Sequence, residues 1–144
     1  VGPAYNDAYS QDIVRKVKAL LNVTYHGALS RDRVKSIYLQ TSLFCSTSDY
    51  EGFPNTFLES WSYGIPILST FDPDNVITHH CLGKTVNSPE QMVAGLRELL
   101  TDENEYRRIA KNARDYYVKY HSVGHVLPVF ERVFFTTIGA GHNG

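Results

Sequence analysis

A turn followed by a predicted helix start, at residues 52–57, has the residue types of an anion-binding site. Gly52 lets a ligand approach the backbone closely, and Pro54 suits the first turn of a helix. The amides of Asn55, Thr56 and Phe57 would then lack carbonyl partners within the helix and would lie at its positive end. The pattern predicts that backbone groups bind a diphosphate here without a basic side chain.

Two glutamates flank this helix start. Glu59 lies four residues after Asn55, so both share one helix face, about 5 to 6 Å apart along the axis. A carboxylate can accept hydrogen bonds from two vicinal hydroxyls, such as those of a ribose. Glu51, in the preceding loop, is placed to contact a sugar on the second phosphate, so the two acids would bracket one nucleotide sugar. For the spacing alone, a solvated helix face with a favourable dipole charge is the alternative explanation.

Short apolar runs alternate with amphipathic segments along the chain. Hydrophobic periodicity and capping residues predict the helices 9–21, 30–38, 55–63, 88–100, 102–117 and 122–134, and the strands 22–27, 42–46, 65–70 and, more weakly, 84–87. This alternation predicts an α/β fold, a Rossmann-like doubly wound parallel sheet. The loop 47–54 follows a strand, and ligands of such sheets bind at the carboxyl ends of the strands.

Composition excludes several classes of protein. The 144 residues are 42% hydrophobic and 20% charged, which is typical of a folded domain, and the net charge of −1 provides no basic field for nucleic acid. No stretch has the roughly 20 apolar residues of a membrane span. Cys45 and Cys81 are isolated, which argues against disulfides or structural zinc and favours a cytoplasmic location. The chain begins with Val1, so we expect an excised piece of a longer protein.

The segment from Glu51 to Glu59 resembles the E-x7-E motif of retaining GT-B glycosyltransferases of the group 1 type, often called family 4. The segments 23–27, 43–48 and 64–70 and the helix capped by Ser88 resemble the C-terminal domain of that family in order and spacing. The resemblance covers nearly the whole chain. It implies the C-terminal half of a two-domain enzyme, with residues 1–138 forming the nucleotide-sugar-binding domain and residues 139–144 a flexible tail.

The resemblance also implies functional roles. It indicates transfer of a hexosyl group, with retention, from a nucleoside-diphosphate sugar to a glycan or lipid-linked acceptor, in carbohydrate or cell-envelope polysaccharide biosynthesis. No metal or cofactor is implied. The implied site consists of Glu51 as the catalytic-site contact to the donor sugar, Gly52 and Phe53 in the donor-sugar loop, Asn55 and Thr56 at the diphosphate, and Glu59 at the ribose.

Parts of the family pattern would precede Val1: a strand, a glycine-rich loop, a basic pair and the N-terminal GT-B domain that supplies the acceptor site. We therefore expect the chain alone to be inactive, and its last helix to expose Val126, Phe130 or Phe134 where that domain docks. Peripheral membrane association of the full enzyme is a further possibility. Sugar-nucleotide epimerases, phosphorylases and non-catalytic interaction domains of the same fold remain alternatives.

Other residues favour structural explanations. Tyr50, Phe53 and Trp61 have rings that can stack on a base, but aromatic side chains more often form a core. Histidines at 79–80 and at 121 and 125 lack a further ligand for zinc. Residues 72–75, Asp-Pro-Asp-Asn, follow the end of the next predicted strand and could approach a ligand from there. Because Pro, Asp and Asn are common turn residues, we favour a turn.

Overall fold

The computed structural model describes residue 2, residues 5–48 and residues 51–139, with the side chains of 137–139 excepted. The chain forms two compact units, Val1–Gln40 and Thr41–Gly144. Residues 140–144 of the expected tail lie outside the described residues, and Gly139 is the last residue of a helix.

The first unit contains two helices, α1 (Ala8–Lys18) and α2 (Arg31–Tyr38), neither of which has a fully buried residue. The strand predicted at 22–27 does not form. Strands require a ladder of neighbouring backbone groups. Within the described residues this stretch is joined to Gly2 by two bonds, from the Gly2 amide to the Gly27 carbonyl (2.8 Å) and from the Tyr25 hydroxyl to the Gly2 carbonyl (3.0 Å).

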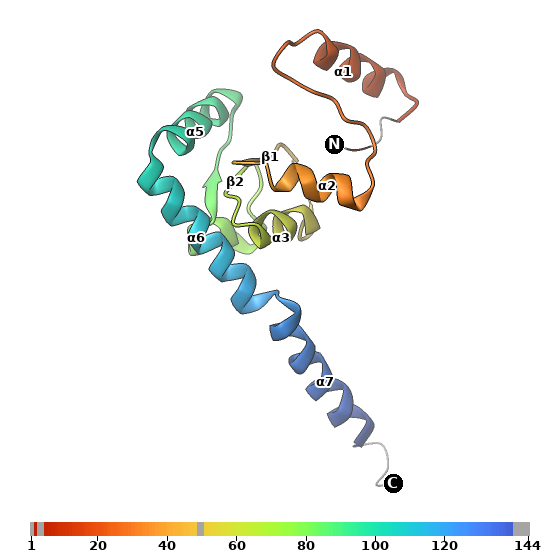
Figure 1. Ribbon diagram of the computed structural model, residues 1–144, viewed down its shortest axis with the longest axis vertical. Helices are drawn as coiled ribbons and strands as arrows, with labels where there is room; N and C mark the ends of the chain where they lie inside the picture. Colours follow the sequence, from red (N-terminus) through yellow and green to blue (C-terminus); the bar gives the residue numbers. More distant parts are fainter. Residues whose placement is uncertain (1, 3–4, 49–50, 140–144) are drawn as a thin grey trace. The chain divides into compact units, whose positions relative to one another are not determined.

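The second unit is built on a parallel sheet of three strands, β1 (Phe44–Ser46), β2 (Ile67–Ser69) and β3 (Gly83–Thr85), in the order β1-β2-β3 (Figure 1). Phe44 pairs with Ile67, and Ile67 pairs with Gly83. Helices connect successive strands, so the predicted Rossmann-like α/β class is confirmed. The strands are shorter than the apolar runs that predict them, and β3 begins one residue before the predicted strand.

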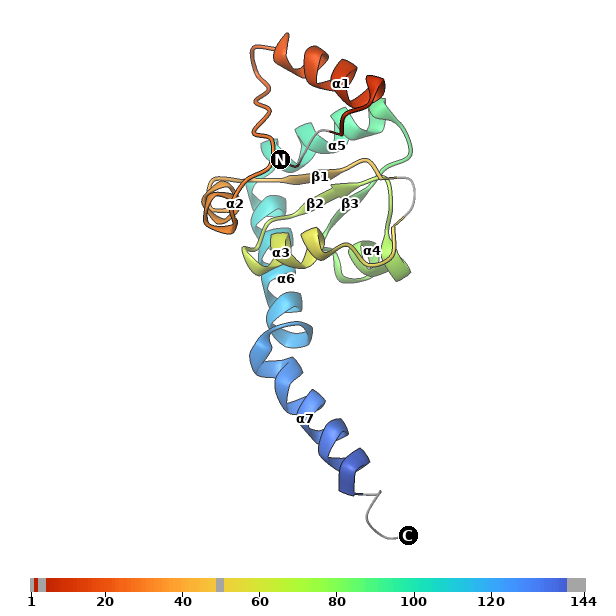
Figure 2. The same ribbon diagram turned by 90° about the vertical axis from the view of Figure 1, so that its right-hand side faces the viewer.

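Helices cover both faces of this sheet. Figure 2 shows α5 (Pro89–Thr101) on one side and α3 (Asn55–Ser62), α4 (Val76–His80) and α6 (Glu103–Tyr120) on the other. Neighbouring residues of β2 supply the two faces, as alternation along a strand requires. Ile67 joins Phe57 and Trp61 in the buried core, whereas Leu68 lies against Gly95 of α5. The last helix, α7 (Val123–Gly139), follows α6.

Local capping explains where several helices begin and end. The helix α3 ends before Gly64, whose φ of +69° is the left-handed conformation that glycine adopts readily. The Ser88 side chain accepts a hydrogen bond from the Gln91 amide (3.3 Å) at the start of α5. Asp102 accepts one from the Glu105 amide (2.9 Å) at the start of α6. These boundaries confirm the sequence predictions.

The helix α4 was not predicted from the sequence. Residues Pro73–Asn75 form a 3-10 turn, which confirms the turn interpretation of 72–75. The Asp72 carboxylate then accepts hydrogen bonds from the amides of Ile77 (2.8 Å) and Thr78 (3.0 Å) and from the Thr78 hydroxyl (2.7 Å). This residue therefore anchors the start of α4 from outside the helix.

We predict that Ser88→Ala lowers the free energy of unfolding by about 1 kcal/mol, because the first turn of α5 loses its side-chain cap. Ser30 is the matched control, since it is the N-cap residue of α2 but makes no side-chain cap hydrogen bond. Ser30→Ala should change stability by less than about 0.5 kcal/mol. Urea denaturation of the three proteins measures both effects, and equal losses would contradict the assigned cap.

Candidate functional site

The loop between β1 and α3 lies at the carboxyl edge of the sheet and is attached to the neighbouring strand end. The Thr70 amide donates to the Ser46 carbonyl (3.1 Å), and the Thr70 hydroxyl donates to the Ser48 carbonyl (2.9 Å). The Ser48 hydroxyl in turn donates to the Glu51 carboxylate (3.2 Å). A chain of hydrogen bonds thus links β2 to Glu51. Tyr50, one of the aromatic candidates, lies outside the described residues.

The helix start differs in two details from the expectation. Pro54 is the buried N-cap residue (φ −68°, ψ 122°) rather than the first residue of the helix. The Phe57 amide is not free, because it donates to the Pro54 carbonyl (3.0 Å). Within the described residues, the amides of Asn55 and Thr56 have no hydrogen-bond acceptor. The predicted anion site is therefore reduced to two backbone donors at this helix end.

Glu59 lies on the exposed side of α3, on the face that Asn55 shares. The buried residues of the helix, Phe57, Ser60 and Trp61, lie on the opposite face. Glu51 is also exposed. The fold therefore directs Glu59 and the free amides to the same solvent-facing side.

Gly52 and Phe53 differ in their surroundings. Among the described residues other than its chain neighbours, a Cβ atom at Gly52 would meet no atom within 4 Å, so this part of the structure leaves space beside its backbone. The Phe53 ring is 39% exposed and packs edge-on against Trp61 (centroids 6.1 Å apart). On another side it lies 6.0 Å from the His121 ring, at an angle of 33°. Trp61 is fully buried, which confirms its interpretation as a core residue.

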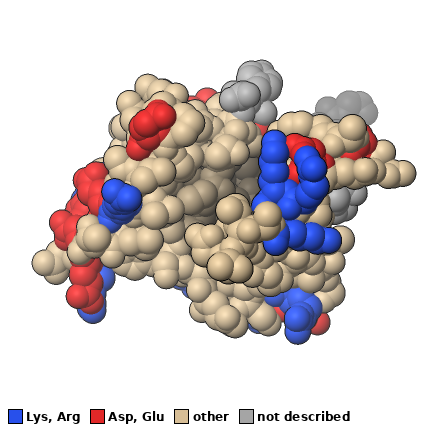
Figure 3. Space-filling model, turned by 90° about the horizontal axis from the view of Figure 1, so that it is seen from above, with Lys and Arg blue, Asp and Glu red and all other residues tan. Residues whose placement is uncertain are grey.

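The site has little charge of its own apart from the two glutamates. Figure 3 shows basic and acidic side chains on the same face of the molecule. The pKa of His121 is lowered, mainly by burial and then by the nearby His125. This shift favours the neutral imidazole beside Phe53.

Two further observations concern metals and membranes. Among the described residues, no group of three or more His, Cys, Asp or Glu side chains is arranged to hold a metal ion. His79 is exposed, and His80 is half-buried against Tyr116. None of the helices in the described part of the chain has the length and hydrophobicity needed to cross a membrane.

Comparison with known proteins identifies the family. The family model described as "Glycosyl transferases group 1" matches residues 1–116, which include the whole candidate site. The chain belongs to this family. A relative, glycosyltransferase 1 domain-containing protein 1 from Xenopus tropicalis, is 23% identical over 124 residues. The alignment covers 85% of this chain but 36% of that protein, so the chain spans little more than a third of the relative's length.

Membership of the glycosyl transferases group 1 family supports a role in glycosyl transfer and confirms the resemblance found from the motif.

Sequence reasoning did not identify Ser48 and Thr70 as residues that hold the loop, nor His121 as a neighbour of Phe53. Their positions follow from pairing of β1 with β2 and from the packing of α3 against α6. Ser48 and Thr70 could have been found from the sequence, because each closely follows a predicted strand, and the ends of two paired parallel strands lie side by side.

Proposed function

We propose that the chain binds the donor of a retaining glycosyltransferase, a nucleoside-diphosphate sugar whose hexosyl group passes to a glycan or lipid-linked acceptor. The observation that supports this most directly is the start of α3, where the amides of Asn55 and Thr56 lack acceptors and Glu59 shares their exposed face. This arrangement occurs at the carboxyl edge of a parallel sheet in a member of the group 1 family.

Each residue then has a separate role in binding. The two amides and the positive end of α3 stabilise the diphosphate, including the negative charge that grows on it as the sugar departs. Glu59 accepts hydrogen bonds from the ribose hydroxyls, and Glu51, held by Ser48, contacts the donor sugar. The open space beside Gly52 admits the diphosphate or sugar close to the backbone. Neither a metal nor a cofactor takes part in this scheme.

Calorimetry and product analysis test this function. The 144-residue chain should bind a nucleoside diphosphate, and the full-length protein should transfer the sugar of a labelled nucleotide sugar with retention at the anomeric carbon. An epimerase would change the sugar without an acceptor, and a phosphorylase would require free phosphate. Failure of every common nucleoside diphosphate to bind the full-length protein would favour a non-catalytic interaction domain.

The site for the reacting hydroxyl of the acceptor belongs, in this proposal, to a part of the full-length protein outside the chain. The exposed apolar side of α7 is the candidate contact: Val126, Phe130 and Phe134 are 45%, 63% and 52% exposed. Large apolar surfaces of this kind usually have a partner. We predict slower amide hydrogen exchange in α7 in the full-length protein than in the isolated chain, and equal exchange would contradict the contact.

We predict that Gly52→Ala weakens nucleoside-diphosphate-sugar binding by about tenfold while leaving stability unchanged. The added methyl group would meet no atom of the described residues beyond its chain neighbours within 4 Å, so the fold should accept it. It would instead occupy space beside the backbone that the donor needs. Calorimetric titration and thermal unfolding of the same samples separate the two effects. Unchanged affinity would remove Gly52 from the donor loop.

A further inference from the structure

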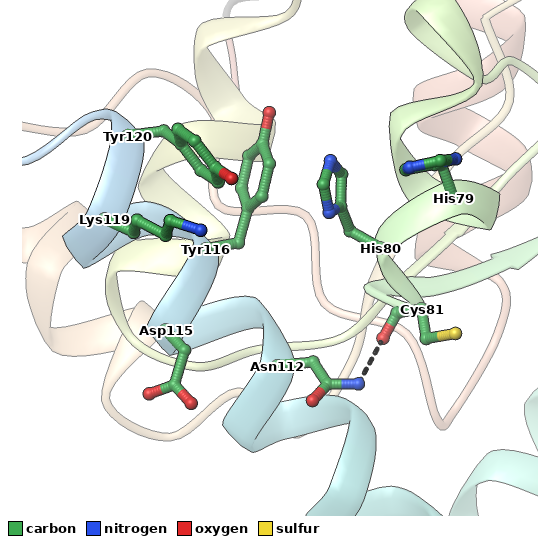
Figure 4. A pocket seen from close by; sticks show the side chains of 8 residues that line it. All are labelled: His79, His80, Cys81, Asn112, Asp115, Tyr116, Lys119 and Tyr120. Atoms are coloured by element: carbon green, nitrogen blue, oxygen red, sulfur yellow. Dashed lines mark hydrogen bonds between the residues drawn. The ribbon is translucent and has the colours of Figure 1, made fainter.

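A groove between α4 and α6 has no part in the proposed donor site. Its volume is about 330 Å³, and Figure 4 shows its lining side chains. One wall comes from the end of α4, at His79 and His80, and the other from a single face of α6 with Tyr116 and Tyr120. The groove therefore belongs to one compact unit and depends on two helices that are distant in the sequence.

Aromatic rings line one end of this groove. The Tyr116 ring lies 4.7 Å from the His80 ring and 5.0 Å from the Tyr120 ring, at angles of 45° and 49°. Tyr120 is 39% exposed, so much of its surface is accessible to a ligand. Figure 4 shows these rings together, with Asp115 and Asn112 at the other end of the groove. One end thus offers apolar ring surface, and the other offers polar groups.

The polar groups retain capacity for further hydrogen bonds. The Asn112 amide donates to the Cys81 carbonyl (3.3 Å), which leaves its own carbonyl oxygen available, and the exposed Asp115 carboxylate pairs with Lys111 on the preceding turn. Within the described part of the chain, the hydroxyls of Tyr116 and Tyr120 have no hydrogen-bond partner. A ligand with several hydroxyl groups could therefore bond to more than one side chain at once.

The charges of the lining balance at neutral pH. The lining has one basic side chain, Lys119, whose ammonium group lies 4.8 Å from the centroid of the Tyr120 ring, and one acidic side chain, Asp115, which pairs with Lys111 outside the lining. The pKa of His80 is lowered, first by burial and then by the charges of His79 and Lys119, so its ring is neutral near pH 7. With one basic and one acidic side chain, the lining does not select for an anion or a cation, and a purely apolar segment would desolvate two charged side chains. A neutral ligand with both apolar and hydroxyl surfaces fits this lining.

We infer that the groove binds a neutral sugar residue. The C–H face of a sugar ring would pack on the exposed Tyr120 ring, beside the half-buried Tyr116, while Asp115, Asn112 and Lys119 bond to its hydroxyls. The argument for a sugar uses the groove alone. The further step, that this sugar is a remote part of a glycan acceptor, rests on the proposed function. A domain that binds the donor sugar for transfer has a use for a second site that holds the glycan receiving it.

The test uses the 144-residue chain and four neutral trisaccharides, composed of glucose, mannose, galactose or N-acetylglucosamine. At least one should give saturation-transfer signals and shift the imidazole resonances of His79 and His80. Tyr120→Ala should weaken that binding by about tenfold, the effect of losing a stacked ring. Tyr63→Ala is the matched control, because Tyr63 is 38% exposed and lies outside the groove; it should leave the affinity unchanged.

A second variant tests the groove even if the Tyr120→Ala protein does not fold. Asp115→Ala alters an exposed side chain, so it should keep the fold while also weakening sugar binding. Three outcomes would overturn the inference: no trisaccharide binds, both variants bind as tightly as the unaltered chain, or uridine shifts the same histidines when sugars do not. The last outcome would indicate a base-stacking site. Titration with a nucleoside diphosphate on the same samples tests the donor site independently, so either proposal can fail while the other holds.

Discussion

Glu59→Ala is expected to weaken nucleoside-diphosphate binding by about 1 to 3 kcal/mol, which is the usual cost of losing hydrogen bonds to a charged group. The Glu59 side chain is exposed and lies opposite the buried face of α3, so packing of the helix does not depend on it. Its loss should therefore lower affinity while the melting temperature without ligand changes little. Isothermal titration calorimetry on the full-length protein gives the affinity directly.

Two comparisons make this result specific for the ribose contact. Glu131 is also an exposed glutamate on a helix, α7, and lies outside the candidate site, so Glu131→Ala should leave affinity unchanged. Replacing the nucleoside diphosphate by inorganic diphosphate removes the ribose, and the Glu59→Ala and unaltered proteins should then bind equally. If Glu59→Ala and the unaltered protein bind the complete nucleotide equally, the assigned role of Glu59 is wrong.

Local residue patterns were sufficient to predict the elements that carry the candidate site. Pro54 before α3 and Gly64 after it define a helix whose boundaries the structure reproduces within one residue. The capping pairs that begin at Ser88 and Asp102 are equally local, because each joins residues three apart in one turn. Predictions of this kind succeed when the stabilising contacts are made within a few residues.

The features that sequence reasoning missed depend on longer-range contacts. The stretch 22–27 has strand-like composition, but no described residues supply the ladder that a strand requires. The helix α4 has five residues, too few for a periodic signal, and it depends on the Asp72 carboxylate outside it. The groove brings His80 next to Tyr116, a pair of residues far apart in the sequence. Only the packed fold brings these groups together.

The site and its sheet are also connected energetically. Thr70 follows β2 and holds the loop that carries Glu51, so the loop geometry depends on the pairing of β2 with its neighbours. Disruption of β2–β3 pairing should therefore affect donor binding as well as stability. Gly83 provides the most direct way to disrupt that pairing without altering a residue of the site.

We expect Gly83→Ala to lower the free energy of unfolding by about 4 kcal/mol or more, the range of severe core changes. Gly83 pairs with Ile67, and a Cβ atom at Gly83 would lie 1.8 Å from the Ile67 carbonyl oxygen and 2.7 Å from its carbonyl carbon. These are backbone atoms of the central strand, so the overlap cannot be relieved by rotating a side chain. Either the β2–β3 ladder separates or the buried Ile67 moves out of the core.

Gly124→Ala is the matched control, because it introduces the same methyl group where, beyond the adjacent helix backbone, no atom of the described residues lies within 4 Å. Gly124 is near the start of α7, so alanine there should be neutral or stabilising by up to about 1 kcal/mol. Urea denaturation gives both free energies, and nucleotide titration of any folded Gly83→Ala protein shows whether the loop geometry is lost with the sheet. A loss below about 1 kcal/mol for Gly83→Ala would be incompatible with this β2–β3 register, since the overlap with the Ile67 backbone would then be relieved at little cost.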